Sequence, residues 1–325
     1  MNKRLKIVFM GTPEFAIPSI DAIYLSGHSL DAVVTTTDKR SGRGRKIFQS
    51  PIKKWAISNN VPLQQPSSLS DKLFLNWLAI MNPDLIVVVA YGKKLPAEIL
   101  NMPPLCCINL HASYLPAYRG AAPIHRAVMD GVEYSGVSVI ELTAQLDAGS
   151  ILSREKEILT EDDTAGDLHD RLAIRGASLL VNTICKLATG TVIKVVQDER
   201  KATYADSLKP QDESINWCRS ALELYNQIRG LNPWPVAYTT LKGKRLKIWK
   251  AQQHQQDHVI HPLIAPGTVV NIENKGITVA TGCGLLEILE VQPAGKRKMD
   301  AVNFVCGYDI TPGMVFGQCD EEIDG

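Results

Sequence analysis

The chain has 325 residues, with 35 Lys and Arg against 34 Asp and Glu, and therefore a formal net charge of +1 at pH 7. Its hydrophobic fraction of 45% is typical of a folded globular protein and excludes a disordered chain. The balanced charge excludes a uniformly basic protein that coats nucleic acid. At about 100–200 residues per domain, the length predicts two domains.

Two features of the sequence indicate a cytoplasmic protein. Apolar runs such as 85–91 are much shorter than the about 20 residues that span a bilayer, and the apolar stretch near the N-terminus is shorter than the about 7–15 residues of a signal peptide. The seven cysteines are odd in number and scattered, without a Cys-x-x-Cys pair, which is typical of a reducing compartment. We expect a cytoplasmic monomer that does not contact membranes.

The first part of the chain alternates between strand and helix patterns. Short apolar runs predict strands at 5–10, 29–36, 85–90, 105–110 and 137–142. Apolar spacing predicts helices at 69–81 and 168–187, and the turn at 11–16 leads into another. Alternating strands and helices favour βαβ units, so we predict an α/β domain with a Rossmann-like, mostly parallel sheet over residues 1–189.

The pattern changes after a polar connection, which we predict to be a linker at 190–208. Ser214 is predicted to cap a helix that runs to residue 228 and ends before Asn232-Pro-Trp-Pro. The remainder reads as all-β. Its short apolar runs predict a smaller, OB-fold-like β-barrel domain at 209–325, with strands at 236–241, 246–251, 267–272, 277–280 and 285–291.

Asn109 and His111 lie at the carboxyl end of the predicted strand 105–110, where ligands bind in open α/β sheets. Strand alternation places both side chains on one side and Leu110 on the other. Asp147 follows the strand 137–142 in a glycine-containing loop, and it joins them only if that strand borders the one with Asn109. On spacing alone, an Asn and a His satisfied by loop backbone remain an alternative.

The motifs Asn109-x-His111, Leu146-Asp147-x-Gly149 and the loop 113–120 together resemble the signature of formyltransferases that use 10-formyltetrahydrofolate. Matches spread over almost the whole chain are similar to the family members whose acceptor is methionyl-initiator tRNA: Gly11-Thr-Pro-Glu-Phe, Ala90-Tyr-Gly, Tyr118-Arg-Gly-Ala-Ala-Pro, Ile215-Asn-Trp, Asn232-Pro-Trp-Pro and Gln292-Pro-Ala-Gly-Lys. One position departs from the family, because its Ser-Leu-Leu-Pro is Ser113-Tyr-Leu-Pro here.

The resemblance implies transfer of a formyl group from N10 of 10-formyltetrahydrofolate, as co-substrate, to the α-amine of methionyl-initiator tRNA in translation initiation. It implies that Asn109 and His111 stabilise an oxyanion and that Asp147 keeps His111 cationic and helps to move the proton. No metal is implied. The implied folate-binding residues are Val88, Val89, Ala90, Tyr91, Ser113, Tyr114, Leu115 and Pro116.

Basic residues gather in three short clusters. Segment 39–46 has five in eight residues, and the resemblance places Arg43 on the key arginine of a loop that enters the tRNA acceptor stem. Five more lie within 242–250, and three within 296–298. The expected tRNA-binding residues are Arg40, Arg43, Arg45, Lys46, Lys244, Arg245 and Lys247. A solvated basic loop without a nucleic-acid partner is the alternative.

Two other functions stay open at this point. A formyltransferase that acts on a small amine, such as an amino-sugar nucleotide or a purine precursor, would share the same catalytic residues. A non-catalytic tRNA-binding protein would need the basic clusters alone. We expect no metal at His254, His258 and His261, because they lie in a polar stretch without a closed ligand set.

Overall fold

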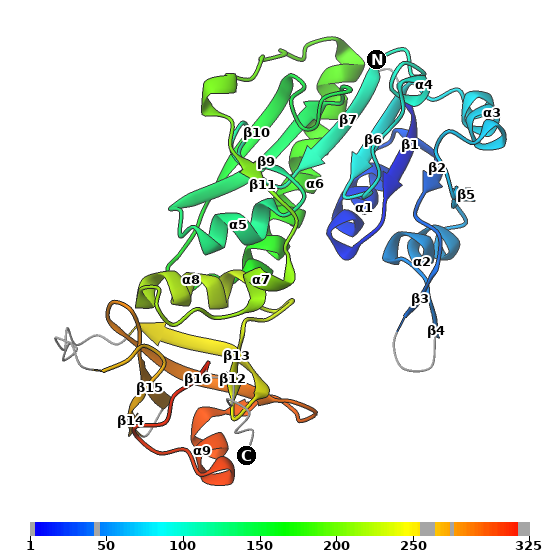
Figure 1. The fold of residues 1–325 in the computed structure, drawn as a ribbon. Coiled ribbons are helices and arrows are strands. Elements are labelled where there is room, and N and C mark those ends of the chain that lie inside the picture. Colours follow the sequence, from blue (N-terminus) through cyan, green and yellow to red (C-terminus); the bar gives the residue numbers. More distant parts are fainter. Residues whose placement is uncertain (1–3, 42–45, 254–263, 274–275, 318–325) are drawn as a thin grey trace. The chain divides into compact units, whose positions relative to one another are not determined.

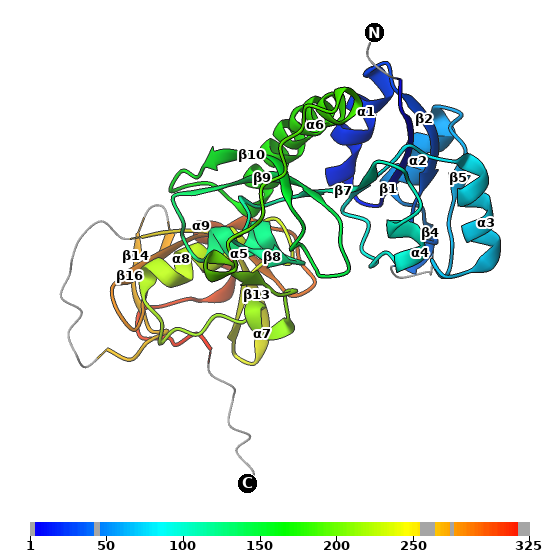
Figure 2. The ribbon, with the colours of Figure 1, turned by 90° about the horizontal axis from the view of Figure 1, so that it is seen from above.

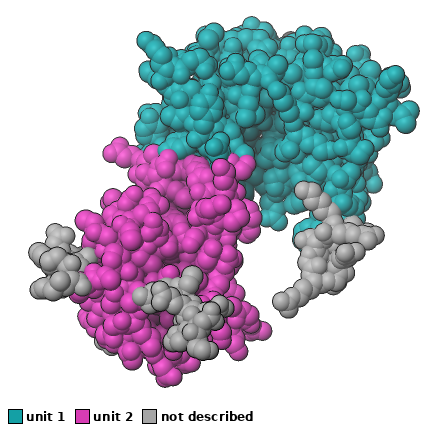
Figure 3. Space-filling view, in the orientation of Figure 1, with its two compact units in different colours: residues 1–123, 134–158, 169–206 teal, residues 124–133, 159–168, 207–325 magenta. Residues whose placement is uncertain are grey.

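The computed structural model describes residues 4–41, 46–253, 264–273 and 276–317 (Figure 1). The chain divides into two compact units, which Figure 3 shows in different colours. Unit 1 comprises 1–123, 134–158 and 169–206, and unit 2 comprises 124–133, 159–168 and 207–325.

Unit 1 contains a seven-stranded sheet with the order β10-β9-β7-β6-β1-β2-β5. Strands β1, β2, β5, β6 and β7 run parallel, whereas β9 and β10 are antiparallel to their neighbours. The predicted Rossmann-like, mostly parallel sheet is confirmed. The strands are β1 (Lys6–Gly11), β2 (Ser29–Val34), β5 (Leu63–Gln64), β6 (Leu85–Val89), β7 (Cys106–His111), β9 (Tyr134–Glu141) and β10 (Ile151–Ile158).

Helices cover both faces of this sheet (Figure 2). One face packs against α3 and α4, because Phe74 and Ile99 share an apolar cluster with Val8 and Val88. The central strand β6 is therefore buried on both sides and is apolar throughout. The helices are η1 (Glu14–Ala16), α1 (Ile17–Leu25), α2 (Pro51–Ser58), α3 (Lys72–Met81), α4 (Ala97–Leu100) and α6 (Ala165–Thr189).

Helix α6 is long and apolar enough to cross a membrane by length and composition, but half of its apolar window is buried within the protein. Its side chains Leu168, Leu172, Leu180 and Ile184 are fully buried. The core helix of a globular protein meets the same criterion of length and composition. Helix α6 is therefore only weak evidence for a membrane span.

Several short elements of unit 1 were not predicted. Helix α2 and strand β10 are missing from the sequence-based assignment, and the basic segment contains a two-stranded antiparallel ribbon, β3 (Lys39–Ser41) and β4 (Lys46–Phe48). The predicted linker 190–208 is structured: it contains η2 (Glu199–Lys201) and β11 (Tyr204–Ala205), and β11 pairs in parallel with β8 (Arg119–Gly120).

Unit 2 is built on an antiparallel sheet with the order β12-β13-β16-β15-β14, to which β17 adds on β16. The segment 313–317 hydrogen-bonds to both edge strands of this sheet, since Val269 N of β14 donates to Met314 O at 2.7 Å and Gly317 N donates to Thr240 O of β12 at 2.9 Å. These contacts support the predicted barrel. The strands are β12 (Tyr238–Leu241), β13 (Lys244–Gln253), β14 (Val269–Glu273), β15 (Gly276–Ala280), β16 (Leu285–Pro293) and β17 (Met299–Asp300).

The helices of unit 2 correct two predictions. The helix expected from Ser214 begins later, because Ser220 forms the cap, while Ile215 and Trp217 are buried in the core of the unit. The all-β expectation for the remainder is also wrong, because an apolar helix packs Phe304 into that core. The helices are α5 (Pro123–Met129), α7 (Pro210–Glu213), α8 (Ala221–Gly230) and α9 (Ala301–Tyr308).

We predict that Ser220→Ala destabilises unit 2 in a pH-dependent way. The Ser220 hydroxyl accepts from Glu223 N at 3.3 Å, and the Ser220 N–H and hydroxyl donate to the Glu223 carboxylate, which lowers the pKa of Glu223 to about 2. Loss of the cap should cost about 1 kcal/mol at pH 7. Alanine keeps the backbone N–H that donates to Glu223 and loses only the contribution of the hydroxyl. Because the folded-state pKa of Glu223 is depressed, that contribution is present above pH 4.5 and is lost as the pH falls toward 2.

Urea unfolding of the full chain at several pH values measures this loss. Ser207→Ala, at an exposed serine of the same unit, is the control. A deficit of Ser220→Ala that stays constant from pH 7 to pH 3 would contradict the prediction.

Candidate active site

Asn109 and His111 lie at the end of β7, between β6 and β9. Asn109 is opposite Val88 of β6 and Ile140 of β9, so the strand that leads to Asp147 does border the strand with Asn109. Leu110 faces the other way, where it contacts Gly176 of α6 so closely that an added Cβ there would lie 2.7 Å from it. Asn109 is half-buried, and no group in the described part of the chain hydrogen-bonds to its carboxamide.

His111 has a partner at each ring nitrogen. The side chain is 6% exposed; its Nε2 lies 2.9 Å from Tyr118 O and its Nδ1 lies 3.6 Å from Asp147 Oδ2. A carbonyl oxygen only accepts hydrogen bonds, so Nε2 carries a proton. Nδ1 faces a carboxylate at a distance that suits an ion pair but is long for a hydrogen bond.

Asp147 is held in a left-handed backbone conformation, with φ of +49°. Its side chain is 7% exposed, and Oδ2 accepts a hydrogen bond from Gly120 N at 2.9 Å. The same oxygen is the one that faces His111. The structure therefore brings Asn109, His111 and Asp147 together at one end of β7, although their segments are separate in the sequence.

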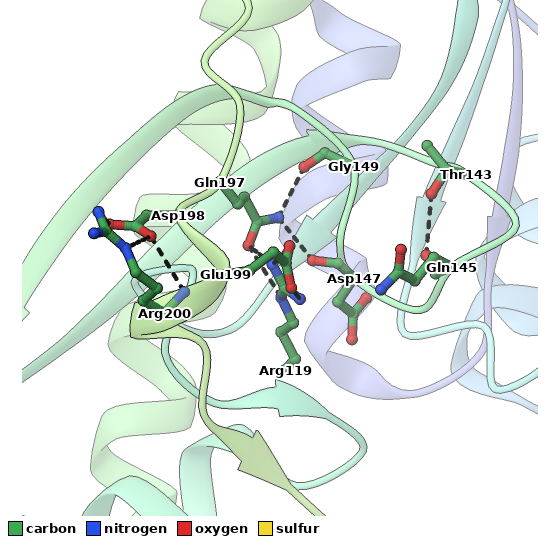
Figure 4. Close-up of polar contacts among 9 residues, drawn as sticks. All are labelled: Arg119, Thr143, Gln145, Asp147, Gly149, Gln197, Asp198, Glu199 and Arg200. Atoms are coloured by element: carbon green, nitrogen blue, oxygen red, sulfur yellow. Dashed lines mark hydrogen bonds and ion pairs between the residues drawn. The ribbon is translucent and has the colours of Figure 1, made fainter.

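Sequence reasoning missed a polar network beneath Asp147 (Figure 4). Gln197 donates to the main-chain oxygens of Asp147 and Gly149, and it accepts from Arg119, which also pairs with Glu199. Arg119 stands in a quoted motif, Tyr118-Arg-Gly, and so could have been found. Gln197 lies in a polar connection with no pattern that marks it.

The loop 113–116, predicted to bind folate, is fastened to the sheet. Ser138 Oγ donates to Ser113 O at 2.8 Å and accepts from Leu115 N at 3.1 Å, while Arg154 donates to Leu115 O. The Arg154 guanidinium also lies 4.3 Å from the centre of the Tyr114 ring. Tyr114, which replaces the family's Leu, thus makes a cation–π contact with Arg154. Pro116 O accepts a hydrogen bond from the backbone N–H of Thr203.

A groove of about 510 Å³ lies in unit 1 on the face that α3 and α4 cover. Asn109 is on this same face, two residues after Cys107 of the apolar cluster. Ala144 lines the groove and belongs to the loop that carries Asp147. The groove combines apolar and polar groups, and its lining is Ser67, Ser68, Leu69, Ser70, Lys93, Lys94, Leu95, Pro96, Ala97, Leu100 and Ala144.

The other predicted folate residues follow β6. Val88 and Tyr91 pack in the cluster that borders the groove, whereas the side chain of Val89 points to the opposite face by strand alternation. Ala90 is exposed and has φ of +47°. Burial raises the pKa of Tyr91 to about 12, and its buried hydroxyl has no hydrogen-bond partner among the described residues.

The predicted tRNA-binding residues lie in both units. Arg40 and Lys46 belong to β3 and β4, while Arg43 and Arg45 lie outside the described residues. On β13, Lys247 donates to Pro235 O at 3.1 Å, Arg245 lies 3.6 Å from the ring centre of Tyr238, and Lys244 is exposed. Leu246 and Ile248 point inward, so Arg245 and Lys247 share the outer face of this strand.

Residues 4–41, 46–253, 264–273 and 276–317 contain no group of three or more His, Cys, Asp or Glu that could hold a metal ion. His254, His258 and His261 lie outside these described residues.

Two family models match most of the chain. Residues 5–184 match the family described as "Formyl transferase", and residues 207–309 match "Formyl transferase, C-terminal domain". The chain is 46% identical over 313 residues to methionyl-tRNA formyltransferase of Moorella thermoacetica, which covers 96% of this chain and 99% of that protein. It is 42% identical over 319 residues to methionyl-tRNA formyltransferase of Bacillus subtilis, covering 98% and 99%.

Two solved structures share the fold. The N-formyltransferase from Helicobacter canadensis in complex with folinic acid and dTDP-3-aminofucose has a TM-score of 0.64 and 17% identity, covering 89% of this chain and 99% of that one. HypX from Aquifex aeolicus in complex with tetrahydrofolic acid has a TM-score of 0.64 and 13% identity, covering 93% and 47%. At these identities the likeness concerns the fold alone.

We predict that Gly120→Ala is more destabilising than its conformation alone requires. Gly120 has φ of +121°, and an added Cβ would lie 2.7 Å from Ala205 O of the paired strand β11. Strain and backbone displacement together should cost about 2–3 kcal/mol. Gly190→Ala is the matched control, because Gly190 has φ of +69° and open space around it, and should lose about 1 kcal/mol. Urea unfolding measures both, and equal losses would contradict the prediction.

Proposed function

The chain belongs to the formyl transferase family, and we propose that it transfers the formyl group of 10-formyltetrahydrofolate to the α-amino group of methionyl-initiator tRNA. The observation that carries this proposal is the likeness to methionyl-tRNA formyltransferases at 41–46% identity over 96–98% of the chain. Asn109, His111 and Asp147, which the sequence motifs single out, meet at the end of β7 and supply the chemistry that such a transfer needs.

A macromolecular acceptor is favoured over a small amine. The likeness to the relatives extends through unit 2, where residues 207–309 match the C-terminal family domain. The N-formyltransferase solved in complex with dTDP-3-aminofucose shares the fold at 17% identity, which carries no argument about the acceptor. The expectation of a cytoplasmic monomer that works without a metal ion remains part of this proposal.

The residues around the groove fit a folate. A folate combines flat aromatic rings with carboxylates, and the groove of about 510 Å³ combines Leu69, Leu95 and Leu100 with Lys93 and Lys94. Its size is that of an ordinary ligand site. When bound, the folate supplies the formyl carbon that the amine attacks.

Asn109 is the residue best placed to stabilise the negative charge that develops on the formyl oxygen. Its amide has no partner within the described residues, so it is free to donate without breaking an existing bond. Removing one such donor typically costs about 10²–10³ in rate. His111 can add a second donor only by releasing Tyr118 O or turning from Asp147.

His111 and Asp147 are proposed to move the proton that the amine releases. An α-amino group with a pKa of about 7.7–8.0 is partly neutral at physiological pH and must lose a proton after it attacks. The Asp147 carboxylate, 3.6 Å from Nδ1 of His111, can accept this proton and pass it, directly or through water, to the leaving nitrogen N10.

Basic side chains on two elements are proposed to contact the tRNA. The ribbon β3–β4 carries Arg40 and Lys46, and β13 presents Arg245 and Lys247 on its outer face next to the exposed Lys244. Phosphate contacts of this kind release counterions and make the affinity depend on salt.

We predict that Asp147→Asn lowers kcat by about 100-fold or more while tRNA affinity changes little, because the amide removes the charge that faces His111. Formyl transfer from 10-formyltetrahydrofolate to methionyl-tRNA is the assay, with free methionine and a sugar-nucleotide amine as competing acceptors. Asn109→Ala should lose about 10²–10³ in kcat in the same assay. An unchanged kcat in Asp147→Asn would refute the role of Asp147, and preferred formylation of a small amine would refute the acceptor.

We also predict that Lys244→Ala and Lys247→Ala weaken tRNA binding by similar factors for all tRNA sequences. Each lost phosphate contact should reduce the slope of log K against log salt by about 1. Binding of methionyl-tRNA over a range of salt concentrations measures the slope. Lys186→Ala, at an exposed lysine of α6 outside the basic clusters, is the control. A wild-type affinity that does not vary with salt would contradict the phosphate contacts.

A further inference from the structure

Among the described residues, the largest fully buried side chain is that of Arg119, a charged residue that is 1% exposed. Its guanidinium donates to both carboxylate oxygens of Glu199, at 2.9 and 2.8 Å, and to Gln197 Oε1 through Nε at 3.1 Å and Nη2 at 2.9 Å. The Arg119 contact lowers the pKa of Glu199, and the Glu199 contact raises the pKa of Arg119. A buried charge with this many partners is held in one geometry.

Gln197 links Arg119 to the loop that carries Asp147. Because an arginine only donates, the Gln197 atom beside Arg119 must be the oxygen, and the amide nitrogen faces the other way. There Nε2 donates to Asp147 O at 2.7 Å and to Gly149 O at 2.8 Å. Figure 4 shows Gln197 between Arg119 on one side and the carbonyls of Asp147 and Gly149 on the other.

The same segment also reaches the second partner of His111. Thr203 Oγ1 accepts from Tyr118 N at 2.9 Å, and Tyr118 O is the group that His111 Nε2 contacts. Segment 197–203 therefore contacts both partners of His111. Gln197 donates to the main-chain oxygen of Asp147, and Thr203 accepts from the main-chain nitrogen of Tyr118. These residues lie between the two family matches, which end at 184 and begin again at 207.

We propose that Gln197, locked by Arg119 and Glu199, is a positioning residue that holds the Asp147 carboxylate opposite His111. The inference rests on the proposed function, in which Asp147 acts in proton transfer. Asp147 has a positive φ, a left-handed conformation that is uncommon for residues other than glycine but that aspartate tolerates. A displacement of about 1 Å at a catalytic group can cost about 10²-fold in rate.

The decisive variant is Gln197→Glu. It keeps the shape and the acceptor for Arg119, but it places a carboxylate oxygen where Nε2 now donates to the carbonyls of Asp147 and Gly149. We expect kcat to fall about 10- to 100-fold, with KM for folate and for tRNA unchanged within about twofold. Gln197→Ala removes the donors without adding charge and should show the same split, should the first variant fail to fold.

Gln227→Glu is a matched control in unit 2. Gln227 is 3% exposed and Gln197 is 6% exposed, and each donates Nε2 to two main-chain oxygens, those of Asp212 and Ser214 in the case of Gln227. The same change of chemistry there should lower the melting temperature without lowering kcat of the folded enzyme. A fall in kcat of Gln197→Glu no larger than that of Gln227→Glu overturns the inference.

The double variant with Asp147→Asn distinguishes a positioning role of Gln197 from a general disturbance of the fold. If Gln197 acts through Asp147, adding Gln197→Glu to Asp147→Asn should lower the residual kcat by less than about threefold. An equal further loss in both backgrounds overturns the inference and leaves the proposed function standing. An unchanged kcat in Asp147→Asn itself would instead overturn the catalytic role of Asp147, and this inference with it.

Discussion

The site depends on the antiparallel pairing of β9 with β7. In that register Ile140 lies opposite Asn109, and the loop after β9 begins with Leu142 N bonded to Cys107 O. His111 is four residues further along β7, which is about 13 Å at about 3.3 Å per residue. The loop must therefore fold back across the face that carries Asn109 and His111, and this return places Asp147 beside His111.

A loop folded back over a sheet has no strand beside it to satisfy its backbone. Its two ends close on each other, since Glu141 N donates to Ser150 O at 3.0 Å, and only a glycine fits at 149, where a Cβ would lie 1.7 Å from Glu141 O. The middle of the loop takes its hydrogen bonds from Gln197 instead. The sheet thus positions Asn109 and His111 directly, whereas Asp147 depends on a segment that sequence reasoning assigned to a linker.

The sequence predicted what local patterns determine. Buried parallel strands such as β6 are continuous apolar runs, and strand alternation was enough to place Asn109 and His111 on one face. It could not predict which strand borders β7, because that choice depends on tertiary packing. Nor could it choose between Ser214 and Ser220 as a helix cap, since burial of Trp217 in the core decides it. The folate loop 113–116 was predicted from resemblance alone, and its bonds to Ser138 were invisible in the sequence.

The net charge of +1 constrains how such a protein would bind tRNA. Long-range attraction is weak for a nearly neutral protein, and at physiological salt it is screened beyond about 8 Å. The cations of β13 are partly fixed before any partner arrives: the guanidinium of Arg245 lies over the Tyr238 ring and Lys247 donates to Pro235 O. Holding a long side chain in place beforehand removes an ordering cost of about 0.5–1.5 kcal/mol at binding. We therefore infer that a few cations, held in place before binding, bind the phosphates of the proposed tRNA acceptor at short range. They compensate for the weak long-range attraction of a nearly neutral protein.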